Sequence, residues 1–163
     1  MSRTTVRSRR AGSARALLIC TATAALAACA SGGGGATGKQ VISPGGGGGP
    51  RLYSPAVRIG DLIFFAGQIG SRPGGRGLAG NIQEETRQAL ENLERIMDAA
   101  DVRREDLVKC TVFLADIRDY DAMNSVYAEF FSGTQPPART AVGVAGLPAG
   151  ARVEIECFAA ARR

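Results

Sequence analysis

The sequence of 163 residues contains no histidine. This absence excludes a Ser-His-Asp triad, a Cys-His pair and imidazole ligation of a metal. For acid–base catalysis we then expect a carboxylate in place of an imidazole. The sequence also lacks an apolar run long enough to cross a bilayer as a mature helix. The length suits one domain of about 100 to 150 residues with a substantial core.

The excess of positive charge is confined to the N-terminus. The formal net charge is +5, and residues 1–28 hold five arginines and no acid, so the rest of the chain carries equal numbers of bases and acids. That remainder has neither a basic excess nor a row of aromatic residues for stacking on bases. A nucleic-acid partner is therefore not predicted.

The first 28 residues have the pattern of an export signal. A basic stretch ends at Arg15, an apolar run covers residues 16–25, and Leu26-Ala27-Ala28-Cys29 follows. This pattern resembles a bacterial lipoprotein signal peptide, in which the thiol of Cys29 receives diacylglycerol before cleavage. It predicts an exported protein anchored in a membrane by its lipid. The alternative is a misassigned start codon upstream of a cytoplasmic protein.

Residues 29–50 are dominated by small residues, with glycine runs at residues 32–35 and 45–49. Such a composition buries too little apolar surface to fold, and it predicts a flexible tether between Cys29 and the folded part. Residues 51–163 are then expected to form the folded domain.

The folded part is predicted to have the order β-β-α-β-α-β-β. The expected segments are a hairpin within residues 57–67 around Gly60-Asp61, a helix from a cap at Asn81 to Ala100, a strand over 107–115, a helix from a cap at Asp119 to Gly133, an extended segment over 138–144 and a strand over 152–160. In the third of these segments the alternation places Val108 on the core face with Cys110. The fold class is α+β, with two helices on one face of a single sheet.

The other face of that sheet is expected to be apolar and uncovered. It would display Phe158, Phe113 and either Phe64 or Phe65 beside Glu154 and Glu156. An apolar face of this size usually marks an interface. We expect a cyclic oligomer whose sheets close around a shared interior, with small-molecule sites between subunits.

Several motifs in the folded part resemble those of the RidA family, also called the YjgF/YER057c/UK114 family. They are Tyr53-Ser54-Pro55-Ala56-Val57, Ala66-Gly67-Gln68-Ile69, Val112-Phe113-Leu114, Asn124-Ser125-Val126-Tyr127, Pro137-Ala138-Arg139 and Val153-Glu154-Ile155-Glu156. The resemblance implies a chorismate-mutase-like fold, a homotrimer and sites at the subunit interfaces. It also implies hydrolysis of reactive enamines and imines, such as 2-aminoacrylate, to 2-oxo acids and ammonia, with no cofactor and no metal.

The resemblance also implies roles for individual residues. Arg139 matches the carboxylate-binding arginine, and a guanidinium grips a carboxylate by two parallel hydrogen bonds. Glu154 matches the glutamate that activates water. The implied pocket residues are Tyr53, Gly67, Asn124, Thr140 and Ala141. Two positions depart from the family pattern, because Ala66 replaces a frequent serine and Ala141 replaces a frequent cysteine, and this puts the preferred substrate in question.

Structural roles for the same residues stay open. Arg139 and Glu154 could form an ion pair between neighbouring strands, and Tyr53 could simply pack. Cys110 and Cys157 are expected on the core face as buried thiols, or as a disulfide if their strands are adjacent. The pKa of Glu154 is also open, because burial would raise it and Arg139 would lower it.

The sequence leaves two functions in competition. One is deamination of imines formed outside the cytosol, for example by amino-acid oxidation. The other is a lipoprotein that binds or senses a small molecule in the same clefts without catalysis. A ribonuclease or translation inhibitor, as some relatives have been described, is disfavoured by the neutral folded part.

Overall fold

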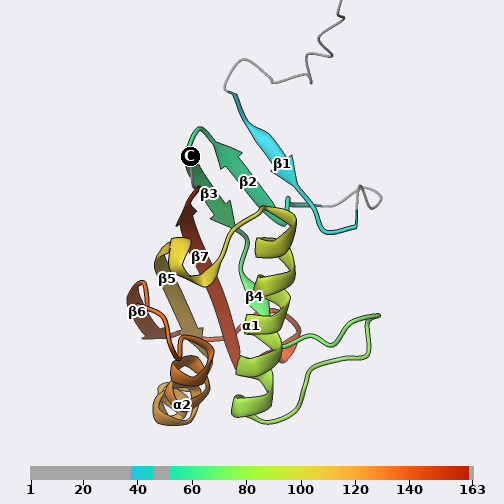
Figure 1. Ribbon diagram of the computed structural model, residues 1–163. Helices are drawn as coiled ribbons and strands as arrows, with labels where there is room; N and C mark the ends of the chain where they lie inside the picture. The colour runs from blue at the N-terminus through green and yellow to red at the C-terminus, as the bar shows by residue number, and fades with distance from the viewer. Residues whose placement is uncertain (1–37, 46–51, 162–163) are drawn as a thin grey trace, which may run out of the picture. The chain divides into compact units, whose positions relative to one another are not determined.

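The computed structural model describes residues 38–45 and 52–161, which contain one sheet and two α-helices (Figure 1). The strands run in the spatial order β1-β2-β3-β7-β5-β6, and β4 also pairs with β7. Their bounds are β1 Gln40–Ile42, β2 Ala56–Ile59, β3 Leu62–Phe65, β4 Gln68–Ile69, β5 Leu107–Leu114, β6 Ala138–Gly143 and β7 Val153–Ala160. The sheet is mixed, because β5 and β6 are parallel whereas the other pairs are antiparallel.

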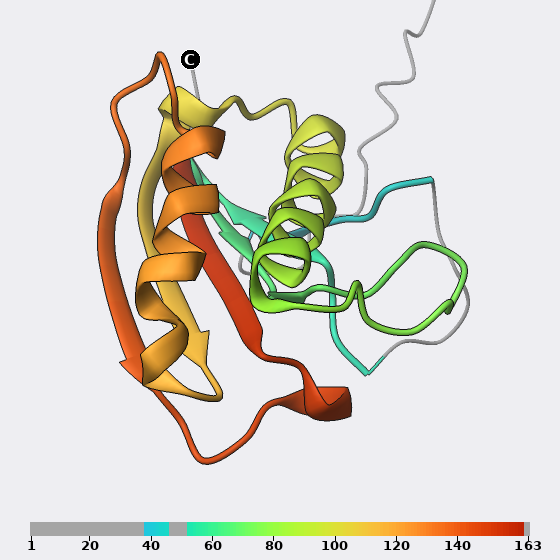
Figure 2. The same cartoon turned by 90° about the horizontal axis from the view of Figure 1, so that it is seen from below.

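Both helices, α1 (Ile82–Ala99) and α2 (Tyr120–Phe130), lie on the same side of the sheet, as predicted (Figure 2). The N-terminus of α1 has the expected capping box. The side chain of Asn81 accepts from the amide of Glu84, and the Glu84 carboxylate accepts from the amide of Asn81. Two otherwise unpaired amides are thereby satisfied.

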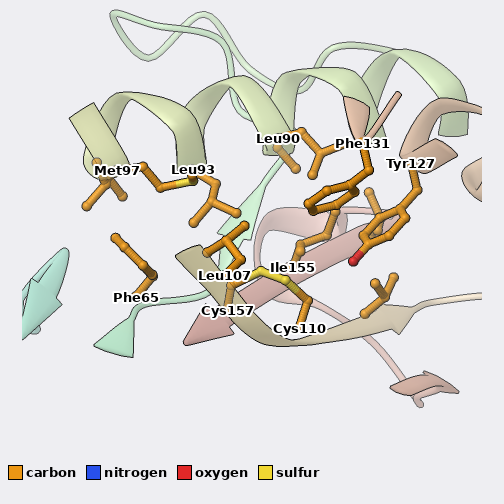
Figure 3. Packing of buried hydrophobic residues seen from close by; sticks show 14 of the residues in the cluster. Phe65, Leu90, Leu93, Met97, Leu107, Cys110, Tyr127, Phe131, Ile155 and Cys157 are labelled. Atoms are coloured by element: carbon orange, nitrogen blue, oxygen red, sulfur yellow. A yellow bond between two sulfur atoms is a disulfide. The ribbon is translucent and has the colours of Figure 1, made fainter. Parts of the chain in front are cut away.

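The core fills the space between the helices and the sheet (Figure 3). Leu90, Leu93 and Met97 of α1 are almost fully buried there. Tyr127 of α2 and Phe131, the residue that caps its C-terminus, pack ring against ring with centroids 4.8 Å apart. Burial of each large apolar side chain stabilises the fold by about 1.5–3 kcal/mol. The helices thus fix β5, β6 and β7, the strands that carry the candidate site.

A disulfide joins the two central strands. Cys110 of β5 and Cys157 of β7 are register partners with Cα atoms 4.1 Å apart, and their sulfurs are bonded at 1.95 Å. Both residues are about 1% exposed on the helix side of the sheet (Figure 3). Of the alternatives that the sequence leaves open for these cysteines, the structure contains the disulfide.

One local expectation was wrong, and another was met only in part. Val108 is 46% exposed and Leu107 is buried instead, because the pairing of β5 with β7 shifts in register between Leu107 and Lys109. Such an irregularity reverses the faces of the residues on one side of it. Asp119 is the N-cap residue of α2, as predicted, but its side chain makes no capping hydrogen bond. Asp116 accepts from the amide of Arg118 instead and begins a short 3₁₀ helix that leads into α2.

The sheet also begins earlier than expected. Residues 40–42 lie inside the segment predicted to be a tether, yet they form β1 and pair with Ala56–Arg58 of β2. The predicted signal peptide over 1–28, Cys29 and the glycine run at 46–49 lie outside the described residues. In the part of the chain that is described, neither helix is long and apolar enough to span a membrane.

Candidate functional site

Arg139 lies on the helix side of the sheet. It is the register partner of the buried Cys110, so its side chain starts from the face that α2 covers. Its guanidinium carbon lies 4.7 Å from the ring centroid of Tyr127, and its Nη2 donates a hydrogen bond of 3.1 Å to the hydroxyl of Tyr120. Strand β6 and helix α2 together therefore orient the guanidinium.

A cavity of about 490 Å³ opens beside this guanidinium. It is lined by Asn124, Tyr127, Phe131, Pro136, Pro137 and Arg139. Asn124 Oδ1 and the hydroxyl of Tyr127 are buried, and neither has a hydrogen-bond partner within the described residues. Burial raises the pKa of Tyr127 to about 12, although Arg139 acts in the opposite direction. The phenol is therefore neutral at physiological pH, and the cavity pairs a cation with neutral polar groups.

Glu154 lies on the opposite, uncovered side of the sheet. Its neighbours in β7, Val153 and Ile155, are fully buried toward the helices, so the alternation turns Glu154 away from them. Its carboxylate lies directly over Gly67, where a Cβ atom would collide with Oε1 and come within 2.8 Å of Cδ. Partial burial raises the pKa of Glu154, and the neighbouring Glu156 raises it further. Glycine at 67 thus makes room for a carboxylate that holds a proton more readily than usual.

The structural ion pair proposed between Arg139 and Glu154 is wrong for this chain. Strand β5 lies between β6 and β7, and the two side chains leave opposite faces of the sheet. The remaining predicted residues divide in the same way. Ala141 is on the face of Arg139, because it pairs with the buried Val112, whereas Thr140 is on the face of Glu154 and accepts from Lys109 Nζ at 2.5 Å.

Tyr53 belongs to neither group in the described chain. It is 67% exposed and lines another cavity, of about 510 Å³, beside Gln68 and the buried Asn92 of α1. The structure therefore brings Asn124 to Arg139 and Gly67 to Glu154, and leaves Tyr53 apart from both pairs. Among the described residues no group of three or more acidic or cysteine side chains is arranged to hold a metal ion.

Two tyrosines contact Arg139 that sequence reasoning did not place in the site. Tyr120 and Tyr127 are seven residues apart, which puts them on one side of a helix after two turns. That spacing is present in the sequence. Nothing local to the sequence predicted that α2 lies over β6, so the contact with Arg139 could not be derived.

The uncovered face also carries the expected aromatic residues. Phe64 is 39% exposed and its ring centroid lies 5.1 Å from that of Phe158, whereas Phe65 is buried. The phenylalanines thus extend from β3 to β7 on the side that carries Glu154. Large exposed aromatic pairs of this kind are typical of interfaces.

Comparisons with known proteins agree with this architecture. Residues 50–161 match the family model described as endoribonuclease L-PSP. Human 2-iminobutanoate/2-iminopropanoate deaminase is 44% identical over 108 residues, which cover 66% of this chain and 78% of that protein. A RutC family protein of Pyrococcus horikoshii is 45% identical over 108 residues, which cover 66% and 85%.

Among solved structures, E. coli TdcF with bound serine superposes with a TM-score of 0.69 at 32% identity, over 76% of this chain and 99% of that chain. The strand order, the two helices and the match to the family model agree with one another. The chain therefore belongs to the endoribonuclease L-PSP family, which is the RidA (YjgF) family that its motifs resemble.

Proposed function

We propose that the protein hydrolyses small 2-imino acids, and their enamine tautomers, to 2-oxo acids and ammonia without a cofactor. Two charged groups support this most. Arg139 lies beside a cavity, and Glu154, whose carboxylate lies over Gly67, has a raised pKa. The relatives named as 2-iminobutanoate/2-iminopropanoate deaminases, and the relative with bound serine, support a small substrate that carries a carboxylate.

The chemistry divides between the two groups. Arg139 binds the substrate carboxylate through two parallel hydrogen bonds. Glu154 accepts a proton from a water molecule as the water oxygen attacks the carbon of the C=N bond, and it returns this proton to the nitrogen, which gives a carbinolamine. When the carbinolamine collapses, its hydroxyl proton passes through Glu154 to the amine nitrogen, the C–N bond breaks, ammonia leaves and the carbonyl forms. Positioned acid–base groups of this kind contribute typically about 10² to 10⁴ in rate.

The two groups cannot act on one small substrate within a single chain, because they leave opposite faces of the sheet. The proposal therefore includes a homotrimer in which Arg139 of one protomer faces Glu154 of the next. The aromatic pair Phe64 and Phe158 on the uncovered face supports burial of that face between protomers.

The decisive experiment measures ammonia release from 2-iminobutanoate generated in the assay by an amino-acid oxidase. The protein over residues 30–163 should accelerate release, and Arg139→Ala and Glu154→Gln should each reduce the acceleration by about 10² or more. Arg87→Ala, which removes a surface arginine paired with Glu129, is the matched control and should keep the rate. No acceleration by the wild type would contradict deamination. Retained binding of 2-oxobutanoate in that case would favour the non-catalytic binding function.

Export to an oxidising compartment is a second part of the proposal, and the disulfide supports it. Disulfides persist in exported proteins and are rare in the cytoplasm, where thiols are kept reduced. Cys110 and Cys157 form such a bond in the core. Imines formed outside the cytosol, for example by amino-acid oxidation, are then the expected substrates. In cells fed labelled palmitate, the full chain should become labelled and the Cys29→Ser variant should not. A wild type that is unlabelled, cytoplasmic and reduced at Cys110 and Cys157 would indicate a misassigned start codon.

A further inference from the structure

Arg139 is held by neutral groups. Tyr120, the first residue of α2, accepts a hydrogen bond of 3.1 Å from Nη2, and its ring centroid lies 5.7 Å from the guanidinium carbon. The ring of Tyr127 lies 4.7 Å from the same carbon. Within residues 38–45 and 52–161 Arg139 is not among the arginines seen in ion pairs, which include Arg87, Arg104, Arg118 and Arg152.

This arrangement holds the Arg139 guanidinium in place without neutralising its positive charge. A carboxylate would also hold the guanidinium in place, but its negative charge would offset the attraction for an anionic ligand. A phenol hydroxyl fixes one N–H and leaves the charge intact. A guanidinium has five N–H donors, and a carboxylate needs two of them. One bond to Tyr120 therefore leaves enough donors for a carboxylate. The aromatic rings add cation–π attraction, again without a negative charge.

We propose that Tyr120 is a positioning residue for Arg139: its hydroxyl aims the guanidinium at the cavity while keeping the positive charge available for the substrate carboxylate. This role rests on the proposed function for its substrate, but it concerns a contact that exists in the chain without any ligand. Tyr120 is not among the residues that line the cavity, and its hydroxyl, hydrogen-bonded to Arg139, acts through that residue.

The test compares Tyr120→Phe, which removes only the hydroxyl, with the wild type. We expect the Kd of 2-oxobutanoate and the KM of the imino acid to rise by about threefold to tenfold, since one hydrogen bond is lost. The kcat should change little, because the hydroxyl of Tyr120 contacts the carboxylate-binding Arg139 and not the group that accepts the proton. Ser125→Ala is the control on the same helix: its hydroxyl donates only to the carbonyl of Ala122, and both constants should stay at wild-type values.

A second variant separates positioning from charge. Tyr120→Glu offers the guanidinium a carboxylate, so it should hold Arg139 and still weaken 2-oxobutanoate more than Tyr120→Phe does. The amide of 2-oxobutanoate has no carboxylate. In both variants its Kd should therefore change less than the Kd of 2-oxobutanoate does. Equal affinity of Tyr120→Phe and the wild type for 2-oxobutanoate would overturn the proposal.

A measurement without ligand distinguishes this proposal from the proposed function. The ¹⁵N signals of the Arg139 side chain, assigned by their loss in Arg139→Lys, report rotation about the Nε–Cζ bond. Rotation should be slow in the wild type and faster in Tyr120→Phe. If the wild type deaminates nothing but shows this difference, the proposed function fails and the positioning role stands. If the wild type deaminates and Tyr120→Phe matches it in rotation and KM, the positioning role fails alone.

Discussion

The two faces of the sheet place their charged groups in opposite electrostatic environments. On the helix side, Arg139 is held by two tyrosines and has no acidic partner among the described residues. On the uncovered side, Glu154 lies over a glycine and beside another carboxylate, and both burial and Glu156 raise its pKa. One face keeps a charge available for an anion, whereas the other raises the pKa of an acid.

This difference matches the two demands of imine hydrolysis. A carboxylate ligand requires a permanent, unbalanced positive charge, and an arginine among neutral groups provides it. Proton transfer requires a group whose pKa lies nearer to the working pH, and desolvation beside a like charge moves a glutamate in that direction. Because the sheet separates the two environments, neither disturbs the other within one chain.

The largest expected effect tests whether two protomers share each site. Arg139→Ala and Glu154→Gln should each be inactive alone, but co-expressed and co-purified trimers of the two should recover activity at about a quarter of their sites, those that receive both wild-type groups from different protomers. The measurement is ammonia release per protomer. Trimers that combine the wild type with the double variant are the reference. Recovery no greater than in either single variant would show that the site does not lie between chains.

A smaller effect is expected from the glycine beneath Glu154. In Gly67→Ala the new Cβ would collide with the Glu154 carboxylate and displace it. A displacement of about 1 Å can cost on the order of 10² in rate, so kcat should fall by about tenfold to a hundredfold while the Kd of 2-oxobutanoate, set by Arg139, changes little. Gly146→Ala is the matched control, because nothing lies within 4 Å of a Cβ there. A normal kcat in Gly67→Ala would separate Glu154 from the chemistry.

The smallest effect concerns pH. Glu154 must be ionised to accept a proton from water, so kcat should be lost as the pH falls through its raised pKa. Glu156→Gln removes the like charge and lowers the pKa of Glu154 toward its usual value. The acid limb of the kcat profile should therefore move to lower pH. Glu129→Gln is the control and should leave the profile in place, because Glu129 lies on the surface of α2 and is paired with Arg87. A shift of the acid limb to higher pH in Glu156→Gln would show that Glu156 does not raise the pKa of the catalytic group.

Local patterns predicted much of the fold correctly. The alternation in 152–160 placed Glu154 away from Val153 and Ile155, and the capping box at Asn81 fixed the start of α1. The failures have a common cause. The exposed Val108 depends on a register shift against β7, and β1 exists because it pairs with β2. Both are properties of a pairing partner and leave little trace in the local sequence.

The candidate site divides along the same line. The resemblance of the motifs to the RidA family implied Arg139 for a carboxylate, Glu154 as the base and Gly67 near the pocket, and the absence of histidine agrees with a carboxylate as the base. Neither the resemblance nor the local pattern indicated Tyr120 as a partner of Arg139, because that contact joins residues that belong to different elements and meet only when α2 lies over β6.

The sequence by itself determined which chemical groups are available and which stretches alternate as strands or repeat as helices, because both are set by residue type and near neighbours. Only the tertiary structure decided that Cys110 meets Cys157 and that Arg139 and Glu154 face opposite sides of the sheet. Those outcomes depend on strand order and register, which are fixed by packing between segments far apart in the chain.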